Sequence, residues 1–185
     1  MHRKELLQNL AAYASPTPEE KEIVGRFASF VQTTPDCFER THAAGHVTGS
    51  AFVLSPDRSC VLLTLHTKLQ RWFQLGGHAD GCPRIHEVAL REAMEESGLT
   101  AVVPCLQPNT PIDYDIHLIP ANKKEGAHLH YDARYLFWSK ESTYACSHES
   151  LELKWVPLQE ISSYCKDPAM LRVIKKITSG AVEAL

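Results

Sequence analysis

The sequence predicts an α+β fold in a single domain spanning residues 1–185, and three features support this. Signals typical of helices fill the first 40 residues, and from Val47 onward the pattern changes to strand-like runs. A strongly charged helical segment at residues 84–97 interrupts those runs. The length of 185 residues suits one domain that buries its own core.

Two helices are expected before residue 40. The first covers residues 3–13, and a Ser-Pro-Thr-Pro break follows it. The second begins after Thr17, with Pro18 at the first helical position and Glu20 three residues beyond the cap, and it runs to about Val31. We therefore expect residues 1–40 to form an N-terminal helical extension on the body of the domain.

Strand-like runs account for most of the remaining chain. They cover residues 47–55, 59–67, 71–75, 101–107, 111–120, 128–138 and 151–158. The third run ends at Gly76-Gly77, a pair that we expect to form a flexible turn. Two short helices, residues 158–164 and 168–178, are expected to close the fold.

The composition argues against several classes of protein. A formal net charge of -3 disfavours binding to a nucleic-acid polymer, which requires clustered Lys and Arg. No stretch approaches the ~20 apolar residues of a membrane span, and Glu5, Gln8 and Asn9 interrupt a start that otherwise resembles a signal peptide. The six cysteines are dispersed and form no CxxC pair. We therefore expect a cytoplasmic protein with no membrane partner.

The helix at residues 84–97 carries an unusual set of carboxylates. At about 100° per residue, Glu92, Glu95 and Glu96 form a fan, and two of them share the angular sector of the apolar residues. Like charges three or four residues apart destabilise a helix, and the macrodipole disfavours acids near its C-terminus. A divalent cation such as Mg²⁺ would relieve both effects. The alternative is a solvated acidic face.

The order of residues in this region resembles the Nudix box, G-x5-E-x7-R-E-U-x-E-E-x-G-U, where U is aliphatic. The matching positions are Gly77, Arg91-Glu92, Glu95-Glu96 and Gly98-Leu99, and Pro83 replaces the first glutamate. The likeness to a bacterial Nudix subgroup also includes residues 37–51, 66–81 and 127–137. It implies a Nudix-like α/β/α sandwich around a mixed β-sheet.

The resemblance also implies an activity. Nudix enzymes use Mg²⁺ or Mn²⁺ to hydrolyse a nucleoside diphosphate linked to another group. By this likeness Glu92 and Glu96 are the main metal ligands, Glu95 is a further ligand, and the Gly76 carbonyl is the backbone ligand. Arg91 would orient or neutralise these carboxylates.

Two aspects of the site are left open at this stage. The general base could be Glu92, Glu95 or an acid on a later loop, Glu149 or Glu152.

Pro83 can still begin the helix, because its missing N–H costs nothing in the first turn. The counter-charge to Arg91 that the replaced glutamate would provide could come from Asp80 or Glu87.

A second polar group is expected on the strand at residues 128–138. His128, His130, Asp132 and Arg134 alternate along it and therefore share one face. We interpret that face as a pocket for phosphate or sugar oxygens, and His78 as a neighbour of the diphosphate. A solvated outer face and, more weakly, a zinc site of the two histidines with Asp132 are the alternatives.

Two other functions compete with hydrolysis. One is an isomerase on the same fold, similar to isopentenyl diphosphate isomerase, although its cysteine context is missing here. The other is a nucleotide-binding regulator with weak catalysis, which the change at Pro83 would favour. A homodimer formed through residues 1–40 is also left open.

Overall fold

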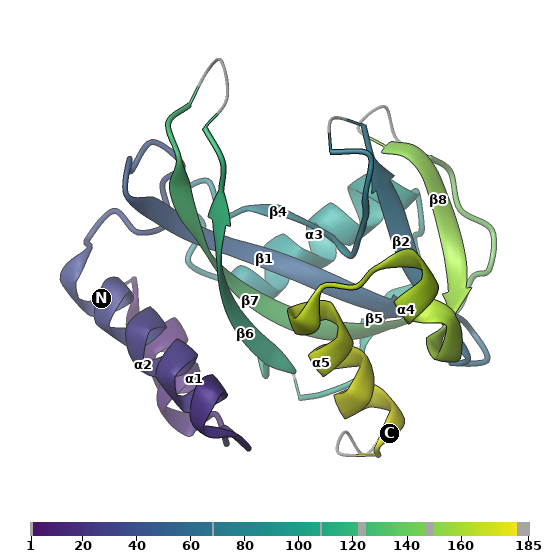
Figure 1. Ribbon diagram of the computed structural model, residues 1–185, viewed down its shortest axis with the longest axis horizontal. Helices are drawn as coiled ribbons and strands as arrows, with labels where there is room; N and C mark the ends of the chain where they lie inside the picture. Colours follow the sequence, from purple (N-terminus) through teal and green to yellow (C-terminus); the bar gives the residue numbers. More distant parts are fainter. Residues whose placement is uncertain (1, 68, 108, 122–124, 147–149, 181–185) are drawn as a thin grey trace.

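The computed structural model describes residues 2–67, 69–107, 109–121, 125–146 and 150–180 (Figure 1). Its helices are α1 (Lys4–Ala12), α2 (Pro18–Thr33), α3 (Ile85–Ser97), α4 (Ile161–Tyr164) and α5 (Pro168–Thr178), with a 3₁₀ turn at Leu158–Glu160. Its strands are β1 (Gly45–Leu54), β2 (Cys60–His66), β3 (Trp72–Phe73), β4 (Leu75–His78), β5 (Val102–Pro104), β6 (Asp113–Ile119), β7 (His128–Ser139) and β8 (Ser150–Pro157).

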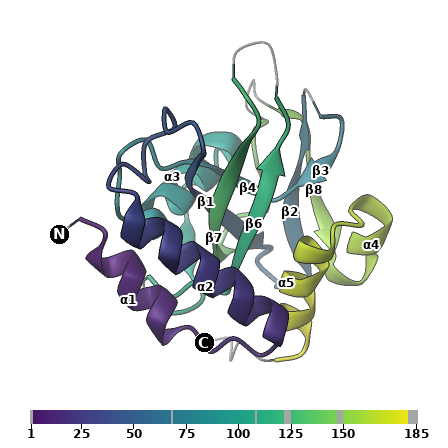
Figure 2. The same cartoon turned by 60° about the vertical axis from the view of Figure 1, so that its left-hand side comes forward.

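The strands form one mixed sheet. Its main path runs β3-β2-β1-β7-β5, with β4 paired to β1, β6 to β7 and β8 to β2. The long central strands β1 and β7 run parallel, and the other pairs are antiparallel. The sheet therefore curls around β1, which contacts β2, β4 and β7 (Figures 1 and 2).

Helices cover the sheet in two groups. Alternate residues of β1 enter different cores, because successive side chains of a strand point to opposite faces. Val47 and Val53 join the core shared with α1, α2 and α3, whereas Phe52 and Leu54 join the core shared with α4 and α5. This arrangement confirms the α+β fold and the sandwich around a mixed sheet.

The N-terminal helices pack on the sheet through aromatic contacts. The ring of Phe30 stacks on Tyr131 with centroids 3.8 Å apart, and Phe27 meets Tyr114 edge-on at 5.3 Å. The predicted start of α2 is confirmed, since the Thr17 hydroxyl accepts a hydrogen bond from the Glu20 amide at 3.2 Å. No described helix combines the length and apolar character needed to cross a membrane.

A buried ion pair joins α5 to the N-terminal helices. The Lys176 ammonium donates to Asp113 on β6 at 2.6 Å and to Glu20 on α2 at 2.5 Å. Glu20 is 3% exposed and Asp113 is fully buried. Because a charge buried without a partner is costly, this contact ties three elements that are distant in sequence.

Candidate active site

Helix α3 presents the predicted carboxylates toward a cleft while its apolar side packs on β1 and β4. Ile85, Val88, Ala89 and Ala93 are buried, as the helical angles predict. Glu92 has 18% of its side chain exposed and Glu95 has 63%. The carboxylates of Glu92, Glu95 and Glu96 therefore lie at the boundary between the packed face of the helix and solvent.

Arg91 lies against the carboxylate fan. Its guanidinium donates to Glu92 at 2.6 Å, and its Nε lies 3.9 Å from a Glu95 oxygen. The hydrogen bond to Glu92, opposed by burial, raises the pKa of Arg91. Asp80 and Glu87, the expected counter-charges, form their direct ion pairs with other residues, although the charge of Arg91 contributes, after the hydrogen bond from Arg40, to the lowered pKa of Asp80.

Asp80 and Glu87 each form an ion pair with an arginine other than Arg91. Asp80 accepts two hydrogen bonds from Arg40, both at 2.5 Å, and Glu87 pairs with Arg84 at 2.7 Å. Arg84, the residue that precedes α3, lies three positions before Glu87, a spacing that brings two side chains together on one helix face.

The glycine pair lies in a strand, and the predicted flexible turn is wrong. Gly76 pairs with Ser50 and Gly77 with Gly49 in the antiparallel β1–β4 ladder. Gly76 has φ 148°, and a Cβ there would lie 2.6 Å from the Gly49 carbonyl oxygen. Glycine is required because the two strands approach too closely for any side chain.

Gly77 makes room for the carboxylate of Glu92. A Cβ on Gly77 would lie 2.4 Å from Cδ of Glu92 and 2.5 Å from one of its oxygens. The Glu92 carboxylate therefore rests against the backbone of β4. Gly49 has a related role, since a Cβ there would lie 2.9 Å from the Ile85 carbonyl oxygen at the start of α3.

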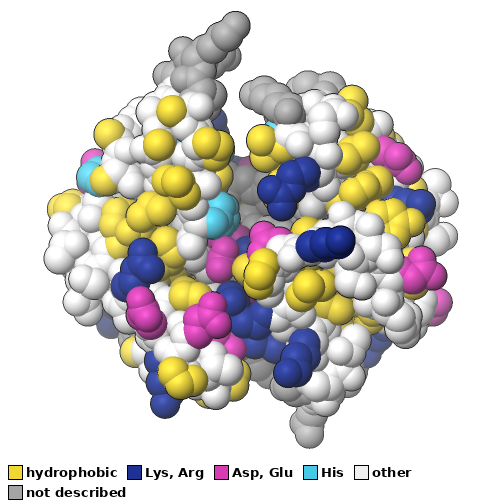
Figure 3. Space-filling model, in the orientation of Figure 1, with side chains coloured by type: hydrophobic (Ala, Val, Ile, Leu, Met, Phe, Trp, Pro, Cys, Tyr) yellow, Lys and Arg dark blue, Asp and Glu magenta, His cyan; other side chains and the backbone are white. Residues whose placement is uncertain are grey.

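A cleft of about 750 Å³ opens beside these residues. Its lining includes seven of the predicted site residues: Gly76, His78, Glu92, Glu95, Glu96, His130 and Asp132. Side chains from β2 and β6 line it as well, and Figure 3 shows the surface hollowed there, with histidine and acidic side chains around the opening. Its volume is in the range of small-molecule sites. Arg91, His128 and Arg134 do not line it.

Asp132 faces the cleft but is firmly held. The hydroxyls of Thr48 and Ser50 donate to its carboxylate at 2.9 Å, and Arg134 donates to it at 3.0 Å. Gln74 in turn donates to the Ser50 hydroxyl at 3.1 Å. This polar row crosses from Gln74, between β3 and β4, through β1 to β7 and gives the floor of the cleft a fixed acceptor pattern.

Arg134 is part of the interior. It is 3% exposed and donates to Asp115 at 3.0 Å, while Arg172 donates to Asp113 at 2.8 Å. Burial opposes the charge of Asp115, but a hydrogen bond from His117 and the two guanidinium groups lower the pKa of that carboxyl to about 2. The polar face of β7 is thus a pocket wall at one end and a buried ion network at the other.

Histidines gather at the open end of the same face. Burial and neighbouring imidazoles lower the pKa of His46 to about 4 and that of His130 to about 2. Burial and the charge of Arg40 lower the pKa of His78 as well. These rings are therefore neutral near pH 7. The sequence interpretation missed His46, and the only available signal was its place at the start of a strand next to other histidine-bearing strands.

The remaining residues named from the sequence lie elsewhere. His128 is 8% exposed, and its Nδ1 lies 2.9 Å from the Gly126 carbonyl oxygen. Glu152 is exposed on β8 and does not line the cleft, and Glu149 lies outside the described residues.

The carboxylate wall fits a hard divalent cation. Three glutamates of one helix meet the backbone of a glycine strand at the cleft, so all the donors on offer are oxygens. Mg²⁺ and Mn²⁺ prefer such oxygen ligands, with part of the coordination shell left for a substrate phosphate. Because Gly77 has no side chain, the Glu92 carboxylate has room beside the strand, and any larger residue at position 77 would fill that room.

Comparison with known families identifies this arrangement. A model of the NUDIX domain matches residues 45–177, which is most of the chain. The chain belongs to the Nudix family. It is therefore a Nudix pyrophosphohydrolase, and the predicted resemblance is confirmed. The match begins at the first residue of β1, so α1 and α2 precede the part that it covers.

Solved structures share the Nudix fold with low sequence identity. The C. elegans Ap4A hydrolase is 16% identical, with a TM-score of 0.52 over 74% of this chain and 98% of that one. A Clostridium perfringens Nudix hydrolase is 23% identical, with a TM-score of 0.51 over 72% and 97%. The E. coli dihydroneopterin triphosphate pyrophosphohydrolase is 15% identical, with a TM-score of 0.53 over 70% and 92%. No curated protein sequence matches the chain.

Proposed function

We propose that this Nudix enzyme hydrolyses a diphosphate bond in a nucleoside diphosphate linked to another group, with Mg²⁺ or Mn²⁺ as its cofactor. The observation that carries the proposal is the meeting of Glu92, Glu95 and Glu96 with the Gly76–Gly77 backbone at one wall of the cleft. A cation held there would neutralise the diphosphate and activate water.

The residues around that wall have distinct tasks. Glu92, Glu95 and Glu96 hold the cation together with the Gly76 carbonyl. Arg91 positions the fan, because its guanidinium holds the Glu92 carboxylate in one orientation.

Among the described residues that line the cleft, two of the acids named for the general base are present. Glu92 and Glu95 both line the cleft, and Glu95 is the more exposed to water there. Loss of the base removes the acidic limb of the pH–rate profile, whereas loss of a ligand raises the metal concentration needed for activity. Comparing Glu92→Gln with Glu95→Gln by both measurements separates the two roles.

The size and lining of the cleft support a small nucleotide-type substrate. The neighbours named above act on Ap4A and on dihydroneopterin triphosphate, both of which contain phosphoanhydride bonds. His78, His130 and Asp132 line the cleft and would contact the part of the substrate beyond the diphosphate. All six cysteines are free, which fits the predicted cytoplasmic location. A homodimer through residues 1–40 stays a prediction.

Replacing Glu96 with glutamine tests the proposal. Activity is first located with ADP-ribose, dinucleoside polyphosphates, nucleoside triphosphates, NADH, coenzyme A and nucleotide sugars, each with Mg²⁺ or Mn²⁺ and with a chelator. We expect Glu96→Gln to reduce turnover by at least about 100-fold, since several kcal/mol of charge stabilisation depends on the metal.

Glu87→Gln is the matched control. Glu87 lies on the same helix but pairs with Arg84 and does not line the cleft, so its loss should leave turnover within about twofold. Full turnover by Glu96→Gln, or activity that persists in the chelator, would show that the carboxylate wall is not the catalytic metal site.

A further inference from the structure

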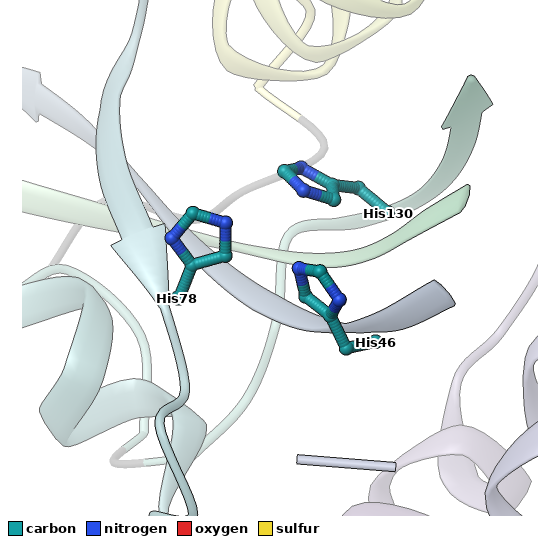
Figure 4. A group of neighbouring side chains, drawn as sticks. All are labelled: His46, His78 and His130. Carbon is teal, nitrogen blue, oxygen red and sulfur yellow. The ribbon is translucent and has the colours of Figure 1, made fainter. Parts of the chain in front are cut away.

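Three imidazoles converge beside the carboxylate wall, and none of them is assigned to the metal or to the cleavage of the diphosphate bond in the proposed hydrolysis. They belong to His46 on β1, His78 on β4 and His130 on β7, and we call them the histidine triad (Figure 4). The strand register brings them together, since His46 lies opposite His130 and the neighbouring Thr48 lies opposite His78. One ring nitrogen from each lies within 4.8 Å of the other two.

Within the part of the chain that the structure describes, several ring nitrogens of this triad lack a hydrogen-bond partner, whereas the adjacent histidines have one. His46 is 2% exposed, and neither of its ring nitrogens has a partner among the described residues. The same holds for Nε2 of His130. In contrast, Nδ1 of His117 lies 3.1 Å from Asp115, and Nδ1 of His128 lies 2.9 Å from the Gly126 carbonyl oxygen.

Buried nitrogens without partners require an explanation. Each one costs about 1–3 kcal/mol when it is left unsatisfied, so such groups usually have a water, an ion or a functional role. The three rings converge on one point, which is the arrangement that a shared ligand requires. Neutral imidazole is the form that binds a metal ion, through the lone pair of one nitrogen.

We propose that the histidine triad binds one Zn²⁺-class transition-metal ion through a nitrogen of each of His46, His78 and His130. The fourth coordination position would face the cleft, because His78 and His130 line it. Three histidines with an open position are a ligand set that suits zinc in catalytic sites. The site is separate from the oxygen donors of α3, and it goes beyond the proposed hydrolysis without depending on it.

The chemistry of the donors distinguishes the two sites. Imidazole suits Zn²⁺, Cu²⁺, Ni²⁺ and Co²⁺, whereas Mg²⁺ prefers carboxylates and water. Tetrahedral coordination at about 2.0–2.1 Å places ligand nitrogens about 3.4 Å apart. The present spacing of up to 4.8 Å closes to that value when the rings shift by about an ångström, which the broad χ2 well of histidine permits.

Cobalt spectroscopy tests the site on the full-length protein. Protein stripped with a chelator is titrated with Co²⁺ in excess Mg²⁺, so that the carboxylate wall is occupied by the hard ion. We expect one equivalent of Co²⁺ to give the intense visible bands of a four-coordinate ion, and Zn²⁺ to abolish them by displacement.

Matched variants locate the ligands. His46→Asn and His78→Asn should each weaken Co²⁺ binding by at least about 100-fold, since even outer-shell changes cost 10–100-fold. His128→Asn and Glu96→Gln should bind as the wild type does, because these residues lie outside the triad. Unchanged binding in both triad variants, or loss of the bands in Glu96→Gln, would overturn the proposal.

Far-UV circular dichroism shows whether each triad variant folds. If one does not, a measurement on the wild-type protein still tests the site. X-ray absorption of the protein with one equivalent of Zn²⁺ should show three imidazole ligands at about 2.0 Å. A coordination shell made only of oxygen ligands would refute the site. So would the absence of any Zn²⁺ or Co²⁺ binding beyond that of a control sample without protein in the same excess of Mg²⁺.

Discussion

Replacing Gly77 with alanine would place a methyl group against the carboxylate of Glu92. The new Cβ would lie 2.4 Å from Cδ of Glu92, whereas ordinary contacts begin at 3.4 Å, so the carboxylate must retreat by about 1 Å. The three heavy atoms nearest to that Cβ all belong to Glu92, and Gly77 does not have a positive φ. The substitution therefore displaces the carboxylate of Glu92, a proposed metal ligand, while leaving the backbone of β4 in place.

The expected effect on catalysis is large and that on stability is small. A misplacement of about 1 Å in an active site can cost about 100-fold in rate, which corresponds to about 2.7 kcal/mol. Glycine to alanine at a compatible position stabilises a protein by about 0.4–1 kcal/mol. We therefore expect Gly77→Ala to lower kcat/KM about 100-fold on the best substrate with Mg²⁺, with an unchanged or slightly raised Tm.

Two further variants sharpen this experiment. Gly25→Ala on the exposed side of α2 has no atom within 4 Å of the added Cβ and should leave activity unchanged. In a Glu92→Gln background, Gly77→Ala should cost much less than it does alone, because both changes act through the same carboxylate. If Gly77→Ala folds and its kcat/KM stays within about threefold of the wild-type value, activity does not require the position of Glu92 beside Gly77. That result would refute the prediction.

Two other predictions concern the buried ion network. Lys176→Met leaves Glu20 and Asp113 without their shared cation, and it should destabilise the protein by about 3 kcal/mol, or about 6–12 °C in Tm, whereas exposed Lys175→Met should change Tm little. An equal Tm for the two variants would contradict this. The carboxyl of Asp115 has a pKa of about 2 against an ordinary 3.8, so its charged form adds stability that is complete above about pH 4 and is lost as the pH falls to about 2. The loss is about 2 kcal/mol in urea unfolding, and Asp115→Asn should flatten it; an unaltered acid dependence in that variant would assign the effect to other groups.

The helices and the carboxylate wall were predictable because helix geometry is local. The start of α2 at Pro18, the span of α5 and the end of α3 at Gly98 agree with the sequence signals. Glu92, Glu95 and Glu96 lie on one side of α3 because a fixed rotation of about 100° per residue relates them, whatever the helix packs against.

The glycine pair and the polar strand show where local reasoning fails. Gly76 and Gly77 look like a turn in isolation, but pairing with β1 makes them a strand whose missing side chains admit a neighbouring backbone and a carboxylate. Arg134 shares a strand face with His130, yet Arg172 and the aspartates of β6 enclose it. Alternation predicts which residues share a face, but not what covers that face.

The sequence by itself determined the family, the acidic helix and the chemistry of its oxygen donors, because these depend on residue types at fixed spacing along one helix. Only the tertiary structure placed His46, His78 and His130 together. They come from three strands, and their meeting depends on the parallel pairing of β1 with β7 and the register of β4 on β1. Such pairings join segments far apart in the chain, so no local pattern specifies them.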